Sequence, residues 1–379
     1  MSAYHQLGND SANLVEEENL SAFRGAILSP VNYEPPEVAA QVERWRSREG
    51  FETVFDPQLY YPKSTRGVLR DWEYFPSDFD TADQASEAWW TTIVQRLTGV
   101  CASIRPSSVC SPCVVPSAFN DDYYLHSVSV CNELLRALAG TGIDGLQTAV
   151  VSMQGLSLRG RALELASVIS RTEAERVYLV FVNTVQPRRE LHNTEELKGG
   201  MRLIAELERA GLHVLVGFTS ADVILWKAAG ASSCASGKFF NLRRFTPSRW
   251  EEPASGGGQV PYWFEESLLA FLRQSDVIRV AQRELLSASS LANPYGRKIL
   301  EQLSAAPYQA WLALGWRQFL YWFSEIESRV GRGPENLDQL FVAAENNWSA
   351  EPRLLLEEVQ NNGEWVRPWR VAVQEYQDH

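Results

Sequence analysis

The stretch Arg176-Val-Tyr-Leu-Val-Phe-Val182 decides the fold class of this chain. After its first residue it is aliphatic, β-branched or aromatic throughout, as expected of a strand that is covered on both faces. An amphipathic segment follows over residues 194–210 and ends at Gly211, which is typical helix punctuation. A buried strand followed by an amphipathic helix indicates a βα unit in a parallel sheet.

The same alternation extends from about residue 23 to about residue 245. We predict strands over residues 25–29, 51–55, 109–115, 146–152, 176–182, 212–217 and 231–237. Their spacing of roughly 30 to 40 residues is the length of one βα element. An eighth strand is expected near residues 260–264. We therefore predict a closed (β/α)8 TIM-like barrel. An open doubly wound parallel sheet is the alternative, because both folds place apolar strands between amphipathic helices.

Three regions are expected along the chain. The barrel core covers residues 21–267. Residues 268–379 have no strand pattern and form a helical C-terminal subdomain, in which the aromatic residues between 311 and 323 have the spacing of a buried helical stripe. Residues 1–20 are predicted to be a mobile N-terminal arm.

Composition narrows the class of protein. The chain has 35 Lys and Arg against 47 Asp and Glu, a net charge of −12, which disfavours binding a polyanion over the whole surface and leaves room for a local basic pocket. The sequence has no run of about 18 apolar residues, and its first twenty residues lack the basic start and apolar centre of a secretory signal. We therefore expect a cytoplasmic protein without membrane contact. The five cysteines are an odd set, which favours reduced thiols.

Ligands of α/β sheets and barrels bind beyond the carboxyl ends of the strands. The sharpest local feature there is Ala231-Ser-Ser-Cys-Ala-Ser-Gly237-Lys238, with Arg243 nearby. Small residues let backbone amides approach an oxyanion, and the cations balance its charge. We predict that Ser236, Gly237, Lys238 and Arg243 bind phosphate or carboxylate. The alternative is a strand whose small residues pack against a helix.

Two residues are candidates for catalysis. Asp56 ends an apolar strand, where burial and a nearby cation could adjust its pKa for proton transfer or let it hold a cation. The alternative is an Asp-Pro turn, in which the carboxylate bonds the backbone two residues on. Lys238 could form a Schiff base or hold an anion. Asn183, Ser220 and Tyr60 follow other strands and are predicted to contact the substrate.

Residues 212–245 resemble the late barrel strands of tRNA-guanine transglycosylases. The order of an apolar strand, Gly217, Asp222, Gly230 and a small-residue strand followed by arginine carries this resemblance, over less than a tenth of the chain. The zinc-binding cysteine and histidine cluster of that family has no counterpart here. The resemblance therefore implies barrel architecture and no activity.

The sequence predicts an enzyme that acts on a small anionic substrate, phosphorylated or nucleotide-derived, at the mouth of a barrel. No dinucleotide fingerprint follows the first strand, and neither a cofactor nor a metal is predicted. The alternative is a scaffold without catalysis that binds a partner protein or nucleic acid through its loops or its helical region. The reaction type, the oligomeric state and catalysis itself are left open.

Overall fold

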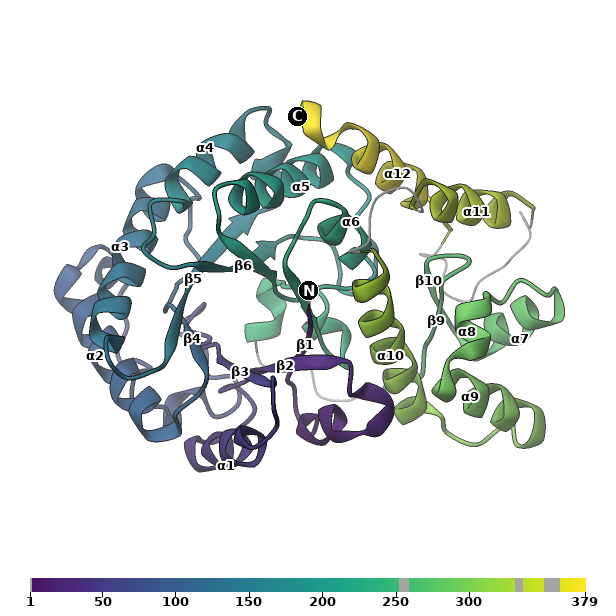
Figure 1. Ribbon diagram of the computed structural model, residues 1–379, viewed down its shortest axis with the longest axis horizontal. Helices are drawn as coiled ribbons and strands as arrows, with labels where there is room; N and C mark the ends of the chain where they lie inside the picture. The colour runs from purple at the N-terminus through teal and green to yellow at the C-terminus, as the bar shows by residue number, and fades with distance from the viewer. Residues whose placement is uncertain (1, 252–258, 331–336, 351–361) are drawn as a thin grey trace.

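The computed structural model of the chain describes residues 2–251, 259–330, 337–350 and 362–379. Eight parallel strands close into a barrel that is surrounded by helices (Figure 1). Closure is complete because β1 (Ser2–Gln6) pairs with both β2 (Phe23–Leu28) and β8 (Ser233–Ser236). The predicted (β/α)8 barrel is confirmed, and the open doubly wound sheet is excluded.

All seven predicted strands are present, as β2 to β8. The five not yet given are β3 (Glu52–Phe55), β4 (Ser108–Cys110), β5 (Asp144–Ser152), β6 (Arg176–Val182) and β7 (His213–Val216). Each of them pairs in parallel with its neighbours in chain order. All strand ends that precede the candidate residues therefore gather at one mouth.

The first strand of the barrel lies where a mobile arm was predicted. Ser2–Gln6 form β1, so the prediction of an arm over residues 1–20 is wrong for this segment. The sequence pattern does not indicate this strand, because His5 and Gln6 are polar and yet fully buried. The Gln6 side chain accepts a hydrogen bond from Tyr178 Oη of β6 at 3.1 Å, inside the barrel.

The predicted eighth strand near residues 260–264 is also a correction. β9 (Trp263–Glu265) pairs in antiparallel fashion with β10 (Ala270–Leu272) in a separate two-stranded sheet. This hairpin spans the predicted boundary at residues 267/268. The last strand of the barrel is β8, which was predicted over residues 231–237. It closes the barrel by pairing with β1.

Twelve α-helices are described. Those between the barrel strands are α1 (Pro35–Arg46), α2 (Glu87–Ile104), α3 (Asp121–Leu138), α4 (Arg161–Ile169), α5 (Thr194–Arg209) and α6 (Val223–Ala228). The later ones are α7 (Gln274–Gln282), α8 (Ala288–Ala292), α9 (Pro294–Ala305), α10 (Leu312–Val330), α11 (Leu337–Ala350) and α12 (Val366–Glu375). Within the described ranges, none has the length and hydropathy that crossing a membrane requires.

The helix α10 completes the outer ring of the barrel. It packs against α6, β8 and β1, and it lies between the barrel and the β9–β10 hairpin (Figure 1). A buried ion pair links it to α6, with Lys227 Nζ 2.9 Å from Glu327 Oε1. The helical C-terminal region is thus partly a component of the barrel and not wholly an appendage.

A polar layer fills the end of the barrel opposite the mouth. Glu52 of β3 pairs with Arg176 of β6 and accepts hydrogen bonds from Tyr4 and Ser108. Burial of the pair is tolerated because each charge has a partner. Higher up, Gly217 leaves room for a ring, since a Cβ there would stand 2.6 Å from Tyr178 Oη. These contacts keep the barrel closed below the site.

Candidate functional site

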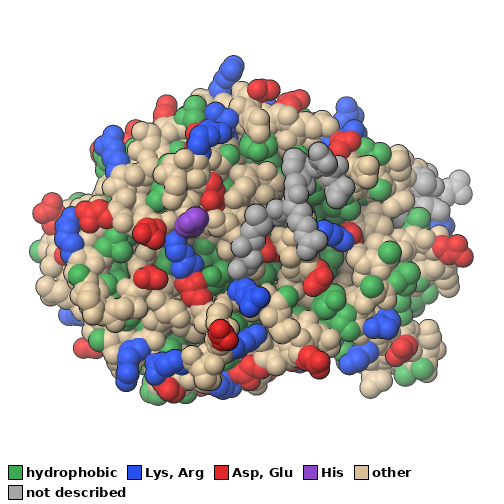
Figure 2. Space-filling model, in the orientation of Figure 1, with side chains coloured by type: hydrophobic (Ala, Val, Ile, Leu, Met, Phe, Trp, Pro, Cys, Tyr) green, Lys and Arg blue, Asp and Glu red, His purple; other side chains and the backbone are tan. Residues whose placement is uncertain are grey.

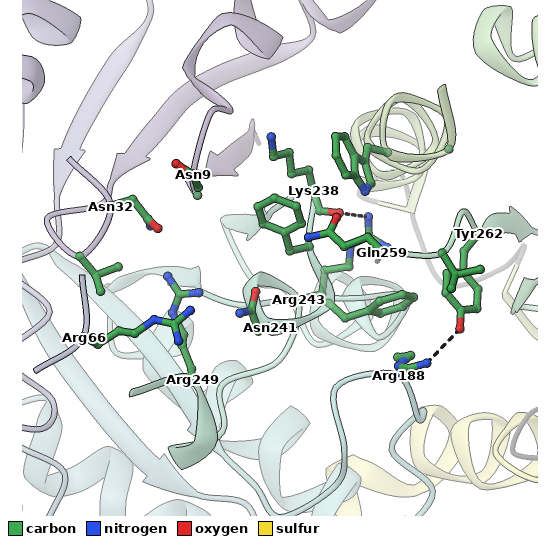
Figure 3. A pocket seen from close by; sticks show the side chains of 17 residues that line it. Asn9, Asn32, Arg66, Arg188, Lys238, Asn241, Arg243, Arg249, Gln259 and Tyr262 are labelled. Atoms are coloured by element: carbon green, nitrogen blue, oxygen red, sulfur yellow. Dashed lines mark hydrogen bonds between the residues drawn. The ribbon is translucent and has the colours of Figure 1, made fainter. Parts of the chain in front are cut away.

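A cleft of about 560 Å³ opens at the mouth of the barrel (Figure 3). Loops that follow β1, β2, β3, β6 and β8 contribute to it, together with the start of α10. Its lining includes Asn9, Asn32, Arg66, Arg188, Lys238, Asn241, Arg243, Arg249, Gln259, Tyr262 and Trp316. The cleft therefore combines amide, aromatic and cationic side chains from segments that are far apart in sequence.

The charge of this lining is of one sign. Its cations are Arg66, Arg188, Lys238, Arg243 and Arg249. Among the described residues that line the cleft there is no Asp or Glu. This contrasts with the net charge of −12 of the chain and with the face drawn in Figure 2, where acidic and basic side chains are interspersed. The fold therefore gathers cationic side chains in a small concave volume.

Arg249 and Arg243 are the two buried arginines of the cleft. Arg249 lies on the short 3₁₀ helix Pro247–Trp250, whose first residue is a proline that presets the backbone. Its side chain is 7% exposed, and its Nε and Nη2 have no hydrogen-bond partner in the described part of the chain. Burial, followed by the charge of Arg66, lowers the pKa of Arg249 to about 10.

Lys238 and Arg243, both predicted from the sequence, do meet in the cleft. Lys238 Nζ donates to the carbonyl of Asp10 at 2.6 Å and lies 4.6 Å from the Trp316 ring centre. Arg243 donates from Nε to the carbonyl of Gly237 at 2.8 Å and packs on the Phe319 ring of α10 at 3.7 Å. Burial lowers the pKa of both side chains, that of Arg243 to about 9. Their positions are thus fixed by backbone and aromatic contacts.

Ser236 and Gly237 have other surroundings. Ser236 Oγ donates to the carbonyl of Thr219 at 2.5 Å, and the residue is fully buried. A Cβ on Gly237 would stand 2.4 Å from Leu242 Cβ, so glycine is needed there for close packing. Neither residue lines the cleft. Their assignment as anion ligands stays a prediction.

Asp56 lies directly after β3, at the same end of the barrel as Lys238. It is 1% exposed; Oδ1 accepts the backbone N–H of Gln58 at 2.9 Å, and Oδ2 accepts the hydroxyl of Tyr60 at 3.0 Å. The Asp-Pro turn is therefore present, with Oδ1 bonded to the backbone. The second oxygen, Oδ2, is bonded to the side chain of Tyr60. Burial raises the pKa of Asp56 to about 7, although these bonds and the charge of Arg249 oppose the rise.

Tyr60 connects Asp56 to the cleft loops. Its ring packs against Phe245 at 4.9 Å and Trp250 at 5.3 Å, measured between ring centres. Tyr60 is buried and does not line the cleft, so a direct contact with a substrate stays a prediction. Its hydroxyl instead holds the carboxyl group of Asp56.

Asn183 and Ser220 follow β6 and β7 and do not line the cleft, and the backbone N–H of Ser220 donates to Asp222 of a second polar cluster. There Arg244 lies between two buried carboxylates, with Nη2 3.3 Å from Glu190 Oε2 and 3.8 Å from Asp222 Oδ2. Asn183 Oδ1 and Ser220 Oγ are buried without partners among the described residues. Burial raises the pKa of Glu190 to about 8. The structure therefore separates these two predicted residues from Lys238 and Arg243.

Two cations of the cleft, Arg66 and Arg249, were not predicted from the sequence. Arg66 lies in the long loop after β3, and Arg249 comes late in the loop after β8. Neither sits in a glycine-rich turn or at a fixed distance from a strand end, so no local pattern marks them. Only the approach of the two loops, where Ser64 Oγ donates to the carbonyl of Trp250 at 2.7 Å, brings them together.

No group of three or more His, Cys, Asp and Glu side chains suited to a metal ion is found within the described residues. All five cysteines are buried as free thiols. Burial raises the pKa of Cys110 and Cys113, which keeps these thiols protonated.

No known family model matches the sequence, and no curated protein does either. Among solved structures, the chain is similar to a type I 3-dehydroquinate dehydratase from Clostridium difficile, at 10% identity over 66% of this chain and 88% of that chain, with a TM-score of 0.37. A GH18 chitinase from Pseudoalteromonas aurantia matches at 10% identity over 64% and 95%, with a TM-score of 0.40. An L-ribulose 3-epimerase matches at 10% over 87% and 96%, also at 0.40. These likenesses concern the fold and carry no argument about ligand or reaction.

Proposed function

We propose that the protein is an enzyme that acts on a small anionic substrate, phosphorylated or nucleotide-derived, bound in the cleft at the barrel mouth. One observation carries this proposal: five cations and, among the described residues, no carboxylate line the cleft of a chain whose net charge is −12. Like charges gathered in one cleft repel one another, and a bound anion removes that cost.

The size and surroundings of the cleft favour a small molecule. Its volume of about 560 Å³ is in the range of pockets that bind metabolites. The aromatic and amide side chains beside the cations supply flat surfaces and hydrogen bonds for the uncharged part of such a molecule. A nucleic acid would need a basic surface longer than the cleft, and on the face drawn in Figure 2 the charges are mixed.

Asp56 is the proposed proton carrier. Its pKa of about 7 lets it exist in both protonation states at neutral pH, which suits general acid–base catalysis. Asp56 does not line the cleft, so the proposal requires a water molecule or a local movement between it and the substrate; Arg249 lines the cleft, and its charge acts on Asp56. Lys238, held by the carbonyl of Asp10, is proposed to bind the substrate anion or to attack a carbonyl group.

The proposal predicts that Asp56→Asn stops turnover while binding persists. A panel of phosphate monoesters and nucleotides is incubated with each protein, and consumption is followed by mass spectrometry. The wild type should convert at least one compound, and the variant should do so about 10²- to 10⁴-fold more slowly. Asp71→Asn, in the same loop and exposed, is the matched control and should keep full activity.

The unfolding temperature of each variant shows whether the fold is intact. Turnover that is unchanged in a folded Asp56→Asn variant would contradict the role of this residue. Compounds that bind in the cleft and are never converted would favour the non-catalytic scaffold, in which losses of binding fall on the arginines and the aromatic residues.

A further inference from the structure

Two arginines face each other at one end of the cleft. Figure 3 shows the side chains of Arg66 and Arg249 meeting there, away from the end where Arg188 donates to Tyr262 Oη at 3.1 Å. They come from loops after β3 and β8, joined by the hydrogen bond between Ser64 and Trp250. Burial, followed by the charge of Arg66, lowers the pKa of Arg249. Two like charges are therefore held together by the fold.

The fold supplies little to offset this repulsion. Arg66 uses Nη1 to donate to the carbonyl of Glu251 at 3.0 Å, a neutral acceptor. Arg249 is buried, with its cation near the rings of Phe218 and Trp250 and with Nε and Nη2 unpartnered in the described part of the chain. Nε and Nη2 share one edge of the planar guanidinium group, the edge that donates two parallel hydrogen bonds to one oxyanion. A buried edge without acceptors is costly.

Asp56 acts on Arg249 through its charge but does not form a direct ion pair with it. Both its oxygens accept hydrogen bonds, one from the backbone of Gln58 and one from Tyr60. Within the described residues, no ion pair joins Asp56 to Arg249, whereas Arg244 has two carboxylate neighbours of its own. Among the described residues, Arg66 and Arg249 therefore have no ion-pair partner, and a bound anion would balance their charges.

We propose that Arg66 and Arg249 form a clamp for a dianionic phosphoryl group, so that the substrate is a phosphate monoester and not a carboxylate. This inference rests on the proposed function and narrows its substrate class. A dianion balances both guanidinium charges, whereas a carboxylate balances one. A phosphoryl group also has three terminal oxygens, enough to accept from the free edge of Arg249 and from Arg66 together.

The clamp is distinct from the pair predicted from the sequence. Lys238 and Arg243 are committed to carbonyl oxygens and aromatic rings, whereas the free edge of Arg249 has no such partner. Asn32 and Asn241 lie near this end of the cleft and offer amide groups to the ester portion of the ligand (Figure 3). The charge of Arg249 acts on Asp56, so an anion bound by Arg249 would alter the charge that Asp56 senses.

Titration calorimetry with the full chain and inorganic phosphate tests the clamp. Phosphate should bind the wild type, and both Arg66→Gln and Arg249→Gln should weaken binding about tenfold or more, the effect expected for losing a charged hydrogen-bond donor. Acetate, with one charge, should bind at least about tenfold more weakly than phosphate. Arg171→Gln, an exposed arginine before β6, is the matched control and should bind as the wild type does.

Arg66 is half-buried, so its variant keeps the test valid if Arg249→Gln does not fold. Full phosphate binding by a folded Arg66→Gln variant would overturn the clamp, as would a wild type that binds no phosphate at millimolar concentration. Loss confined to Lys238→Gln would overturn the clamp and leave the proposed anion site standing. Binding that no cleft substitution changes would remove both.

Discussion

At the scale of single residues, the central features are a buried carboxyl group and a buried guanidinium group whose Nε and Nη2 have no hydrogen-bond partner in the described part of the chain. Burial raises the pKa of Asp56 to about 7 against the opposing effects of its hydrogen bonds with Gln58 and Tyr60 and of the charge of Arg249. Arg249 lines the cleft, whereas Asp56 does not. Under the proposed function, Asp56 carries the proton and Arg249 binds the anion.

The raised pKa predicts how Asp56 affects stability. In the unfolded chain Asp56 ionises near its ordinary pKa of 3.8, whereas in the folded protein it ionises near 7. The folded state thus binds the proton more tightly, so the contribution of Asp56 to stability falls as the pH rises from about 4 to 7. From pH 5 to pH 8, the wild type should lose roughly 2–3 kcal/mol more stability than Asp56→Asn.

Urea unfolding of the two proteins at both pH values measures this difference. Glu190, whose pKa is also raised by burial, contributes equally to both proteins and cancels in the comparison. Equal pH dependence in wild type and variant would show that Asp56 is not buried as a neutral acid.

At the scale of elements, α10 occupies the position in the outer ring that the helix directly after β8 would have in a simple barrel. The hairpin and helices α7, α8 and α9 come between them in sequence. Contacts of α10 with α6, β8 and β1 close the outer ring, and its Phe319 covers Arg243 of the cleft. The helix therefore connects barrel closure to the shape of the site.

The ion pair between Lys227 and Glu327 should hold α10 in this place. Both side chains are buried, and Lys227 Nζ also donates to the carbonyls of Ala231 and Ser232. Glu327→Ala leaves a buried cation without its partner and should lower the free energy of unfolding by about 3–5 kcal/mol. The double variant Lys227→Met/Glu327→Leu should recover part of this loss. Urea unfolding measures both, and a Glu327→Ala variant as stable as the wild type would contradict the assignment.

At the scale of the whole molecule, periodicity predicted the barrel well. Strands β2 to β8 were foreseen because they are continuous runs of apolar or small residues before amphipathic helices. β1 was missed because its residues His5 and Gln6 are polar and yet buried, with Tyr178 donating to Gln6 Oε1 and His5 Nδ1 in contact with the carbonyl of Ser236. Trp263–Glu265 has the apolar pattern of a barrel strand, but it pairs with β10. Local sequence does not determine which strands pair with each other.

The sequence predicted only those cleft residues that follow closely after a single recognisable strand. Lys238 and Arg243 follow a small-residue strand closely, and both line the cleft. Arg66 and Arg249 are separated by most of the barrel sequence and meet through loop packing, so no spacing rule finds them. The concentration of cations in one cleft is likewise a property of the fold, because the chain as a whole is acidic.

A crystal structure of the full chain grown with inorganic phosphate tests the anion-binding cleft most directly. We predict phosphate at the barrel mouth, with oxygens at hydrogen-bond distance from Arg249 and from a second cleft cation. A cleft that stays empty of phosphate, at a concentration that saturates binding in solution, would contradict the proposed site.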